Sequence, residues 1–157
     1  VDKRIDVIAT AMRGGITAPE LADLELAYAP PFGSAKDPVN MLGYVAENVI
    51  SGVSKVAQWH EIDEYREKGY ELLDVRTASE CGNGIIPGAI NIPVDEIRDR
   101  HQALKNKNVL VNCQVGLRGH TGSMLLKELG FNAVNLDGGY LTWINSPAAI
   151  KLKEMSK

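Results

Sequence analysis

The chain has 157 residues, a formal net charge of −3 and 45% hydrophobic residues, which is enough for one ordinary domain and a smaller second part. The slightly acidic balance argues against binding nucleic acid or an anionic membrane surface through positive charge. No apolar run reaches the roughly 18 residues of a membrane span, and we expect no signal peptide. Two cysteines, Cys81 and Cys113, are too few for a disulfide framework, so we expect a reducing, cytoplasmic setting.

Residues 1–52 predict three short helices that need a further surface to pack against. Gly14-Gly15 ends the first helix, Thr17 and Glu20 have the spacing of a capping box, and Asp37 before Pro38 predicts the start of the third. Short helices with this much apolar surface do not form a stable domain alone. The chain begins at Val1 without an initiator methionine, and we expect it to be a piece of a longer protein. The apolar face of the third helix is predicted to consist of Met41, Leu42, Val45 and Val49.

The second part predicts an α/β fold that begins after a linker at 53–57. Strand and helix patterns alternate over 58–146, and 147–157 is taken as a tail. Such alternation predicts a mostly parallel sheet with helices on both faces, in which ligands bind beyond the carboxyl ends of the strands. The expected strands are 56–59, 71–75, 89–92, 109–112 and 133–136, and the expected helical segments are 61–68, 77–80, 94–104, 120–129 and a last one that carries Tyr140 and Trp143.

The most informative segment is the loop from Cys113 to Arg118, which follows a buried strand and precedes a helix predicted at 120–129. A helix start leaves backbone N–H groups unpaired and carries partial positive charge. A cysteine placed there is expected to act as a thiolate nucleophile. The loop residues are expected to cradle an anionic substrate. They are Gln114, Val115, Gly116, Leu117 and Arg118.

The spacing of this loop favours sulfur chemistry over phosphate chemistry. Four residues separate Cys113 from Arg118, one fewer than in the phosphate-binding loops of protein-tyrosine-phosphatase-type enzymes. The shorter loop gives a tighter pocket, and Gly116 permits the bend that the loop needs. Arg118 has two possible roles, to orient an anionic substrate or to tie the loop to a carboxylate such as Asp74 or Glu80.

The other polar residues are given supporting or neutral roles. Asp74 and Arg76 follow a predicted strand and are expected to support the loop. Cys81 is either an incidental loop thiol or a group that resolves a persulfide at Cys113. His120 is expected to be solvated or to cap its helix rather than to catalyse, and His60 is expected at the surface, as is His101. The histidines and cysteines are too scattered to predict a metal site.

Residues 70–145 resemble a single rhodanese domain. The motifs that carry the resemblance are Leu73-Asp74-Val75-Arg76, Ile86-Pro87-Gly88-Ala89-Ile90-Asn91-Ile92-Pro93, the loop Cys113–Arg118, and Leu136-Asp137-Gly138-Gly139-Tyr140 with Trp143. The resemblance implies a rhodanese-like fold and a sulfurtransferase that forms a persulfide on Cys113, with sulfane-sulfur donors and thiol acceptors as partners. One position departs from the family, because Ile85 stands where a histidine is common.

Residues 1–52 resemble the end of the dimerisation domain of pyridine nucleotide-disulfide oxidoreductases, in the coenzyme A-disulfide reductase and NADH oxidase branch. The stretch from Leu24 to Asn48, which contains the segment Tyr28 to Asn40, carries this resemblance. A tail of this kind before a rhodanese domain resembles the fusions called coenzyme A-disulfide reductase with a rhodanese domain, or NADH-dependent persulfide reductase. It implies upstream reductase domains, a homodimer, and FAD, NAD(P)H and coenzyme A for the whole protein, with Tyr28 and Tyr44 as candidate dimer-site residues. Since no Gly-x-Gly-x-x-Gly occurs here, we expect this chain to bind no cofactor itself.

Three hypotheses follow for the function. The first is a rhodanese module that relays sulfane sulfur within a flavin- and NADH-dependent reductase. The second is a phosphatase or an arsenate reductase-like enzyme built on a similar loop, which the loop spacing disfavours. The third is a non-catalytic module for sulfur binding or dimerisation, against which Cys113 and Arg118 argue.

Overall fold

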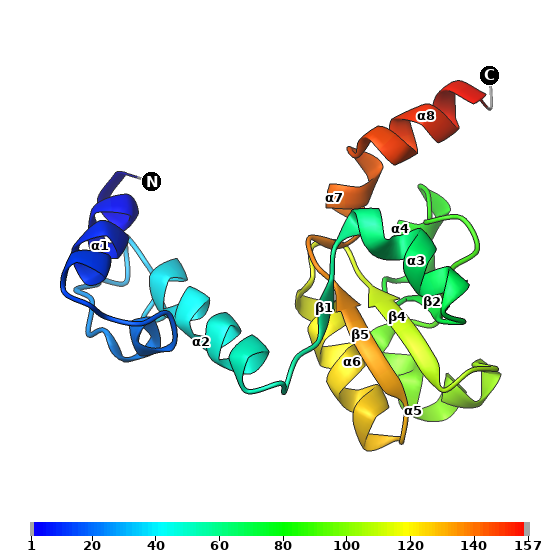
Figure 1. Cartoon of the computed structure of the whole chain (residues 1–157), viewed down its shortest axis with the longest axis horizontal. Coiled ribbons are helices and arrows are strands. Elements are labelled where there is room, and N and C mark those ends of the chain that lie inside the picture. The colour runs from blue at the N-terminus through cyan, green and yellow to red at the C-terminus, as the bar shows by residue number, and fades with distance from the viewer. Residues whose placement is uncertain (1, 156–157) are drawn as a thin grey trace. The chain divides into compact units, whose positions relative to one another are not determined.

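The computed structural model describes residues 2–155, except for the side chain of Lys153. The chain divides into two compact units, Val1–Val53 and Ser54–Lys157, and Figure 1 shows the helical first unit and the sheet-containing second unit. Within residues 2–155, no helix is both long enough and apolar enough to cross a membrane.

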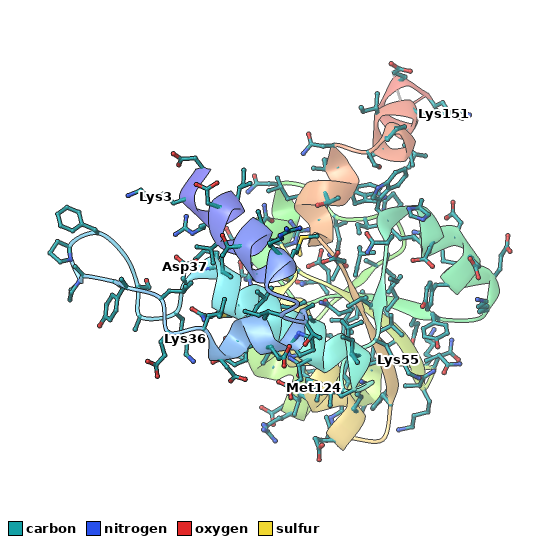
Figure 2. All side chains as sticks on the ribbon, turned by 60° about the vertical axis from the view of Figure 1, so that its left-hand side comes forward. Lys3, Lys36, Asp37, Lys55, Met124 and Lys151 are labelled. Atoms are coloured by element: carbon teal, nitrogen blue, oxygen red, sulfur yellow. The ribbon has the colours of Figure 1, made fainter. Side chains whose placement is uncertain are left out.

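The first unit contains two α-helices and a short 3-10 helix. These are α1 (Asp2–Arg13), η1 (Pro19–Asp23) and α2 (Pro38–Ile50). Asp37 caps α2 as predicted, since its carboxylate accepts the Val39 N–H at 3.0 Å, and it lies at the start of that helix in Figure 2. The buried Asn40 side chain donates to the Leu21 and Leu24 carbonyl oxygens at 3.1 and 2.8 Å, which fixes η1 against α2.

Two expectations for the first unit were wrong. Thr17 does not cap a helix: η1 begins at Pro19, with Ala18 before it, and the Thr17 amide and hydroxyl instead donate to the Glu20 carboxylate at 2.7 and 2.6 Å. The buried face of α2 is also not the predicted one. It consists of Val39, Asn40 and Gly43, because the Gly43 Cα lies so close to η1 that an added Cβ would be 2.2 Å from the Ala22 nitrogen. The side chains of the predicted face are exposed, namely Met41, Leu42, Val45 and Val49.

The second unit is built on a five-stranded, wholly parallel sheet with the order β1-β5-β4-β2-β3. Its strands are β1 (Val56–Ala57), β2 (Glu71–Asp74), β3 (Ile90–Asn91), β4 (Asn108–Asn112) and β5 (Asn132–Leu136). The parallel register pairs Asp74 with both Asn112 and Asn91. The carboxyl ends of the three neighbouring strands β3, β2 and β4 therefore meet at one edge of the sheet.

Alternate residues of the strands enter two separate hydrophobic cores, one on each face of the sheet. Leu72 and Leu110 enter one core, whereas Leu73 and Val111 enter the other. Figure 1 shows α6 lying along the sheet; Leu126 of α6 and Ile97 of α5 fill the second core. The α/β fold with helices on both faces is confirmed. The helices of this unit are α3 (Ile62–Glu67), α4 (Ala78–Gly82), α5 (Ile97–Arg100), α6 (Leu117–Glu128), α7 (Gly139–Ile144) and α8 (Pro147–Met155), with 3-10 turns η2 (Trp59–Glu61), η3 (Val94–Glu96) and η4 (His101–Ala103).

Three segments of the second unit differ from the expectation. The predicted linker at 53–57 is shortened by β1, which confirms part of the strand expected at 56–59, pairs with β5 and buries Ala57. The predicted tail at 147–157 contains α8, whose Ala149 is buried in a core. The helix expected at 120–129 begins at Leu117, because Gly116, with a φ of +118°, turns the chain directly into it.

Candidate functional site

Cys113 is the first residue after β4, at the carboxyl edge of the sheet. Its Sγ accepts the backbone N–H of Gly116 at 3.1 Å, and the residue is only 1% exposed. Gly116 is the N-cap residue of α6, so the sulfur lies at the amino end of a twelve-residue helix. Partial positive charge and free N–H groups at a helix start stabilise an anion. The loop is therefore arranged to hold a sulfur anion.

Residues at the start of α7 hold the backbone of this loop through hydrogen bonds. Tyr140 and Leu141 donate their N–H groups to the carbonyl oxygens of Cys113 and Gln114 at 2.7 and 3.0 Å. Gly139, with a φ of +55°, makes this approach possible, because a Cβ there would lie 2.4 Å from the Cys113 oxygen. One segment, residues 139–141, thus fixes the loop by two hydrogen bonds and by a close contact at Gly139 that admits only glycine.

A buried ion pair supports the site from the β2 side. Asp74 and Arg76 are 0% and 2% exposed, and the guanidinium donates to the carboxylate from Nη2 at 2.7 Å and from Nε at 3.0 Å. The same carboxylate accepts the Arg76 N–H and the Asn112 side chain, both at 3.0 Å. Asn91 donates to the Asp74 and Arg76 carbonyl oxygens at 2.9 and 2.8 Å. The pair thus connects the ends of β2, β3 and β4.

The guanidinium of Arg76 also reaches the loop from Cys113 to Arg118. Its Nη1 donates to Gln114 Oε1 at 3.4 Å and its Nη2 to the Gly84 carbonyl oxygen at 2.8 Å. The ring of Tyr140 lies 4.0 Å from the guanidinium carbon, at a distance suited to a cation–π contact. Arg76 therefore lies between the sheet, the loop and α7. The supporting role expected of it stays a prediction.

Arg118, in the first turn of α6, forms a two-point ion pair with Glu80 of α4. Its Nη1 and Nη2 donate to the two carboxylate oxygens at 2.8 and 2.6 Å, and both side chains are about one-third exposed. The guanidinium, helped by the Thr77 N–H, lowers the pKa of Glu80 from 4.5 to about 2. Of the two roles considered for Arg118, the structure shows the tie to a carboxylate.

Cys81 lies on α4, beside the buried ion pair. Burial raises the pKa of this thiol, and the negative charge of Asp74 raises it further. These effects favour the neutral thiol over the thiolate. The placement brings Cys81 to the same edge of the sheet as Cys113.

The histidines lie in three different surroundings. His120 is half-buried in α6, where its Nδ1 contacts the Ser54 hydroxyl at 2.8 Å, and His60 is exposed. His101 packs its ring edge-on against Phe131, so it is less of a surface residue than expected. Among the described residues, no group of three or more His, Cys, Asp or Glu side chains could hold a metal ion.

The two tyrosines singled out by sequence both lie in the first unit. Tyr28 is 53% exposed. Tyr44 is half-buried, its hydroxyl accepts a hydrogen bond from Lys36, and the Lys36 ammonium lies 4.5 Å from the centre of its ring. Lys36 stands near the start of α2 in Figure 2. Their part in a dimer stays a prediction.

Sequence reasoning missed two residues of the site. Tyr140 was placed in a helix and in a family motif but given no role at the site, although it contacts both Arg76 and the loop backbone. Asn135 of β5 was not considered, yet its buried side chain donates to the Gly116 carbonyl oxygen at 3.2 Å. The usable signals were the glycine pair at Gly138-Gly139, which marks a close backbone approach, and a polar residue inside an apolar strand.

Comparison with known proteins agrees with this geometry. Residues 58–146 match the model of the Rhodanese-like domain. The chain is 53% identical over 49 residues to a protein named coenzyme A disulfide reductase from Staphylococcus haemolyticus, and the match covers 31% of this chain and 11% of that protein. The curated relatives therefore extend well beyond the segment that they share with this chain.

Two solved structures match nearly the whole chain. The reduced CoADR-RHD of Bacillus anthracis is 48% identical, with a TM-score of 0.86 over 92% of this chain and 26% of its own. The NAD-dependent persulfide reductase of A. fulgidus is 38% identical, with a TM-score of 0.79 over 91% of this chain and 26% of its own. The chain thus spans about a quarter of the length of these two proteins. The matched family model and the cradle around Cys113 show that this chain belongs to the rhodanese-like domain family.

Proposed function

We propose that the chain is a rhodanese-type sulfurtransferase module, in which Cys113 carries sulfane sulfur as a persulfide. One observation carries the proposal most strongly. The Cys113 sulfur lies at the amino end of α6 and already accepts the Gly116 N–H at 3.1 Å. A backbone donor held in this position stabilises negative charge on sulfur before and after transfer.

The transfer consists of two displacements at sulfur. In the first, the Cys113 thiolate attacks the terminal sulfur of a donor R–S–S⁻, the donor S–S bond breaks, and R–S⁻ leaves with the electron pair. In the second, an acceptor thiolate attacks the outer sulfur of the Cys113 persulfide and restores the Cys113 thiolate. Each step forms one S–S bond and breaks one, so neither step needs a further oxidant or reductant.

The residues around Cys113 hold the reacting sulfur rather than transfer protons. Tyr140 and Leu141 fix the Cys113 and Gln114 carbonyl groups, which supports the loop conformation in which the Gly116 N–H contacts the sulfur. Because Cys113 is 1% exposed, only the terminal atom of a donor reaches it. The tight loop suits transfer of a single sulfur atom better than binding of a phosphate ester.

In the longer protein we propose that this module works beside reductase domains, as the names of its relatives suggest. The residues of this chain do not fit a dinucleotide cofactor. They contain no Gly-x-Gly-x-x-Gly, and the turn after β4 is filled by Gly139, where even a Cβ would lie 2.4 Å from the Cys113 oxygen. FAD and NAD(P)H would therefore be bound by other parts of a cytoplasmic homodimer, with coenzyme A among the possible thiol partners.

The test compares the whole chain with its Cys113→Ser and Cys81→Ser variants. After treatment with thiosulfate or inorganic polysulfide, mass spectrometry of peptides should find one added sulfur on Cys113. Transfer to a thiol acceptor should be abolished in Cys113→Ser and kept in Cys81→Ser. The absence of an adduct on Cys113 with every donor would refute the proposal, and turnover of a phosphate ester would point to the phosphatase alternative.

A further inference from the structure

The cradle consists of the loop Cys113–Arg118 and the side chains of Asp74, Arg76 and Glu80 beside it. Its charged side chains are paired with one another. Asp74 pairs with Arg76, and Glu80 pairs with Arg118, so the formal charges of these four residues cancel. A donor that approaches Cys113 therefore meets two compensated ion pairs and the helix N-terminus, rather than an uncompensated cation. The charge that a donor meets near Cys113 affects how tightly anionic donors of different charge bind.

The two ion pairs differ in how deeply they are buried. Asp74 and Arg76 are almost completely buried, whereas Glu80 and Arg118 are about one-third exposed. The Glu80 carboxylate accepts hydrogen bonds from both Nη1 and Nη2 of Arg118. The guanidinium of Arg118, the last residue of the loop that begins at Cys113, is thus already paired with a carboxylate.

We infer that Glu80 determines the donor specificity of the sulfur transfer, by masking Arg118 and so disfavouring dianionic donors such as thiosulfate relative to organic persulfides. The inference rests on the proposed function and extends it to the class of donor. Thiosulfate brings two negative charges to the cradle, while an alkyl persulfide brings one at most. Since Coulomb energy scales with charge, masking one cation penalises the dianion more.

The side chains on the rim of the loop favour the same class of donor. Val115 and Leu117 are 58% and 70% exposed, and both flank Gly116, whose N–H contacts the Cys113 sulfur. Aliphatic groups beside the nucleophile gain by covering the carbon chain of an organic persulfide. They offer no hydrogen bond to the three oxygens of thiosulfate.

The masking persists across the neutral pH range. Arg118 and the Thr77 N–H hold the pKa of Glu80 at about 2, so the carboxylate stays ionised at every pH at which the thiol chemistry runs. Only a change of residue, or a stronger competing anion, removes the mask.

Glu80→Gln tests the inference, because glutamine removes the charge and still suits the third position of a capping box. The natural cap is the contact of Glu80 with the Thr77 N–H at 2.9 Å. We expect kcat/KM for thiosulfate to rise roughly fivefold, mainly through a lower KM, which is the effect of one partly exposed ion pair. With the hydropersulfide of 2-mercaptoethanol as donor, which brings one charge at most, kcat/KM should rise by no more than roughly twofold. Glu96→Gln is the matched control, since it removes an equal charge from an exposed pair with Arg100.

The results separate this inference from the proposed function. If a persulfide forms on Cys113 but the thiosulfate-to-hydropersulfide ratio is equal in wild type, Glu80→Gln and Glu96→Gln, the inference fails alone. If Glu80→Gln does not fold, the salt dependence of the wild type decides. A masked Arg118 predicts that KM for thiosulfate does not rise with ionic strength, whereas a steep rise would show an uncompensated cation and overturn the inference.

Discussion

Replacement of Asp74 by asparagine should destabilise the second unit more than any exposed charge change can. The substitution keeps the size of the side chain but leaves the Arg76 guanidinium, 2% exposed, without a counter-charge. It also places an amide N–H₂ opposite donors, because the carboxylate oxygens now accept from Arg76 and Asn112. Breaking a buried ion pair by removing one partner typically costs about 3–5 kcal/mol.

That loss is large beside the roughly 5–15 kcal/mol by which domains of this size are stable. It can be measured by urea unfolding followed through tryptophan fluorescence. Both tryptophans of the chain, Trp59 and Trp143, lie in the second unit, so the signal reports that unit alone. The midpoint should fall while the slope of the transition stays unchanged.

Asp63→Asn is the matched control, because it removes the same charge from an exposed pair with Arg66. Such pairs contribute about 1 kcal/mol at most. If Asp74→Asn costs no more than Asp63→Asn, then burial of the Asp74–Arg76 pair does not carry the penalty argued for it, and its support of the loop would need another explanation.

Two further predictions concern the Glu80–Arg118 ion pair and the close contact of Gly139 with the loop. The pKa of Glu80 is lowered from 4.5 to about 2, so its pair with Arg118 adds stability that is fully present above pH 4.5 and is lost as the pH falls toward 2. The urea stability of wild type should therefore exceed that of Glu80→Gln by under about 1 kcal/mol at pH 7, and a gap that does not shrink by pH 3 would contradict this. Gly139→Ala should cost about 1–3 kcal/mol and greatly reduce sulfur transfer, because its Cβ would meet the Cys113 oxygen at 2.4 Å. Gly82→Ala, with open space around it, should change neither stability nor activity, and wild-type behaviour of Gly139→Ala would refute the close contact.

The strands were predictable because buried parallel strands are continuous apolar runs. Residues 109–111 form such a run, residues 133–136 form one interrupted only by Asn135, and both lie within strands of the sheet. The start of α6 was not predictable in the same way. Gly116 begins that helix through its positive φ rather than through a side-chain cap. A glycine in a loop permits a positive φ, but the sequence alone does not show that the residue adopts one.

The site was predictable in its residues more than in its contacts. The parallel register brings Asp74 beside the end of β4, as expected for residues that follow neighbouring strands. By contrast, the choice of Glu80 over Asp74 as the partner of Arg118 depends on where α4 lies. The clamp from Tyr140 depends on how α7 packs, which no local pattern encodes. Such contacts join segments that are distant in sequence.

The order of the strands also has a consequence for how the second unit folds. Its first strand, β1, pairs only with its last, β5, through Val56 with Asn135 and Ala57 with Leu136. Closing a loop of roughly 80 residues carries a large entropy cost, and such distant pairings slow folding.

During synthesis, β1 therefore has no neighbour to pair with until the ribosome has made β5. Strand β4, which precedes Cys113, can pair with β2 earlier, but the loop after it is held by Gly139 and Tyr140, which follow β5. The surroundings of Cys113 are thus completed only after residues 139 and 140 have been made. A truncated product that ends before residue 139 would carry Cys113 on an unclamped loop, so premature termination should yield protein without the ordered cradle.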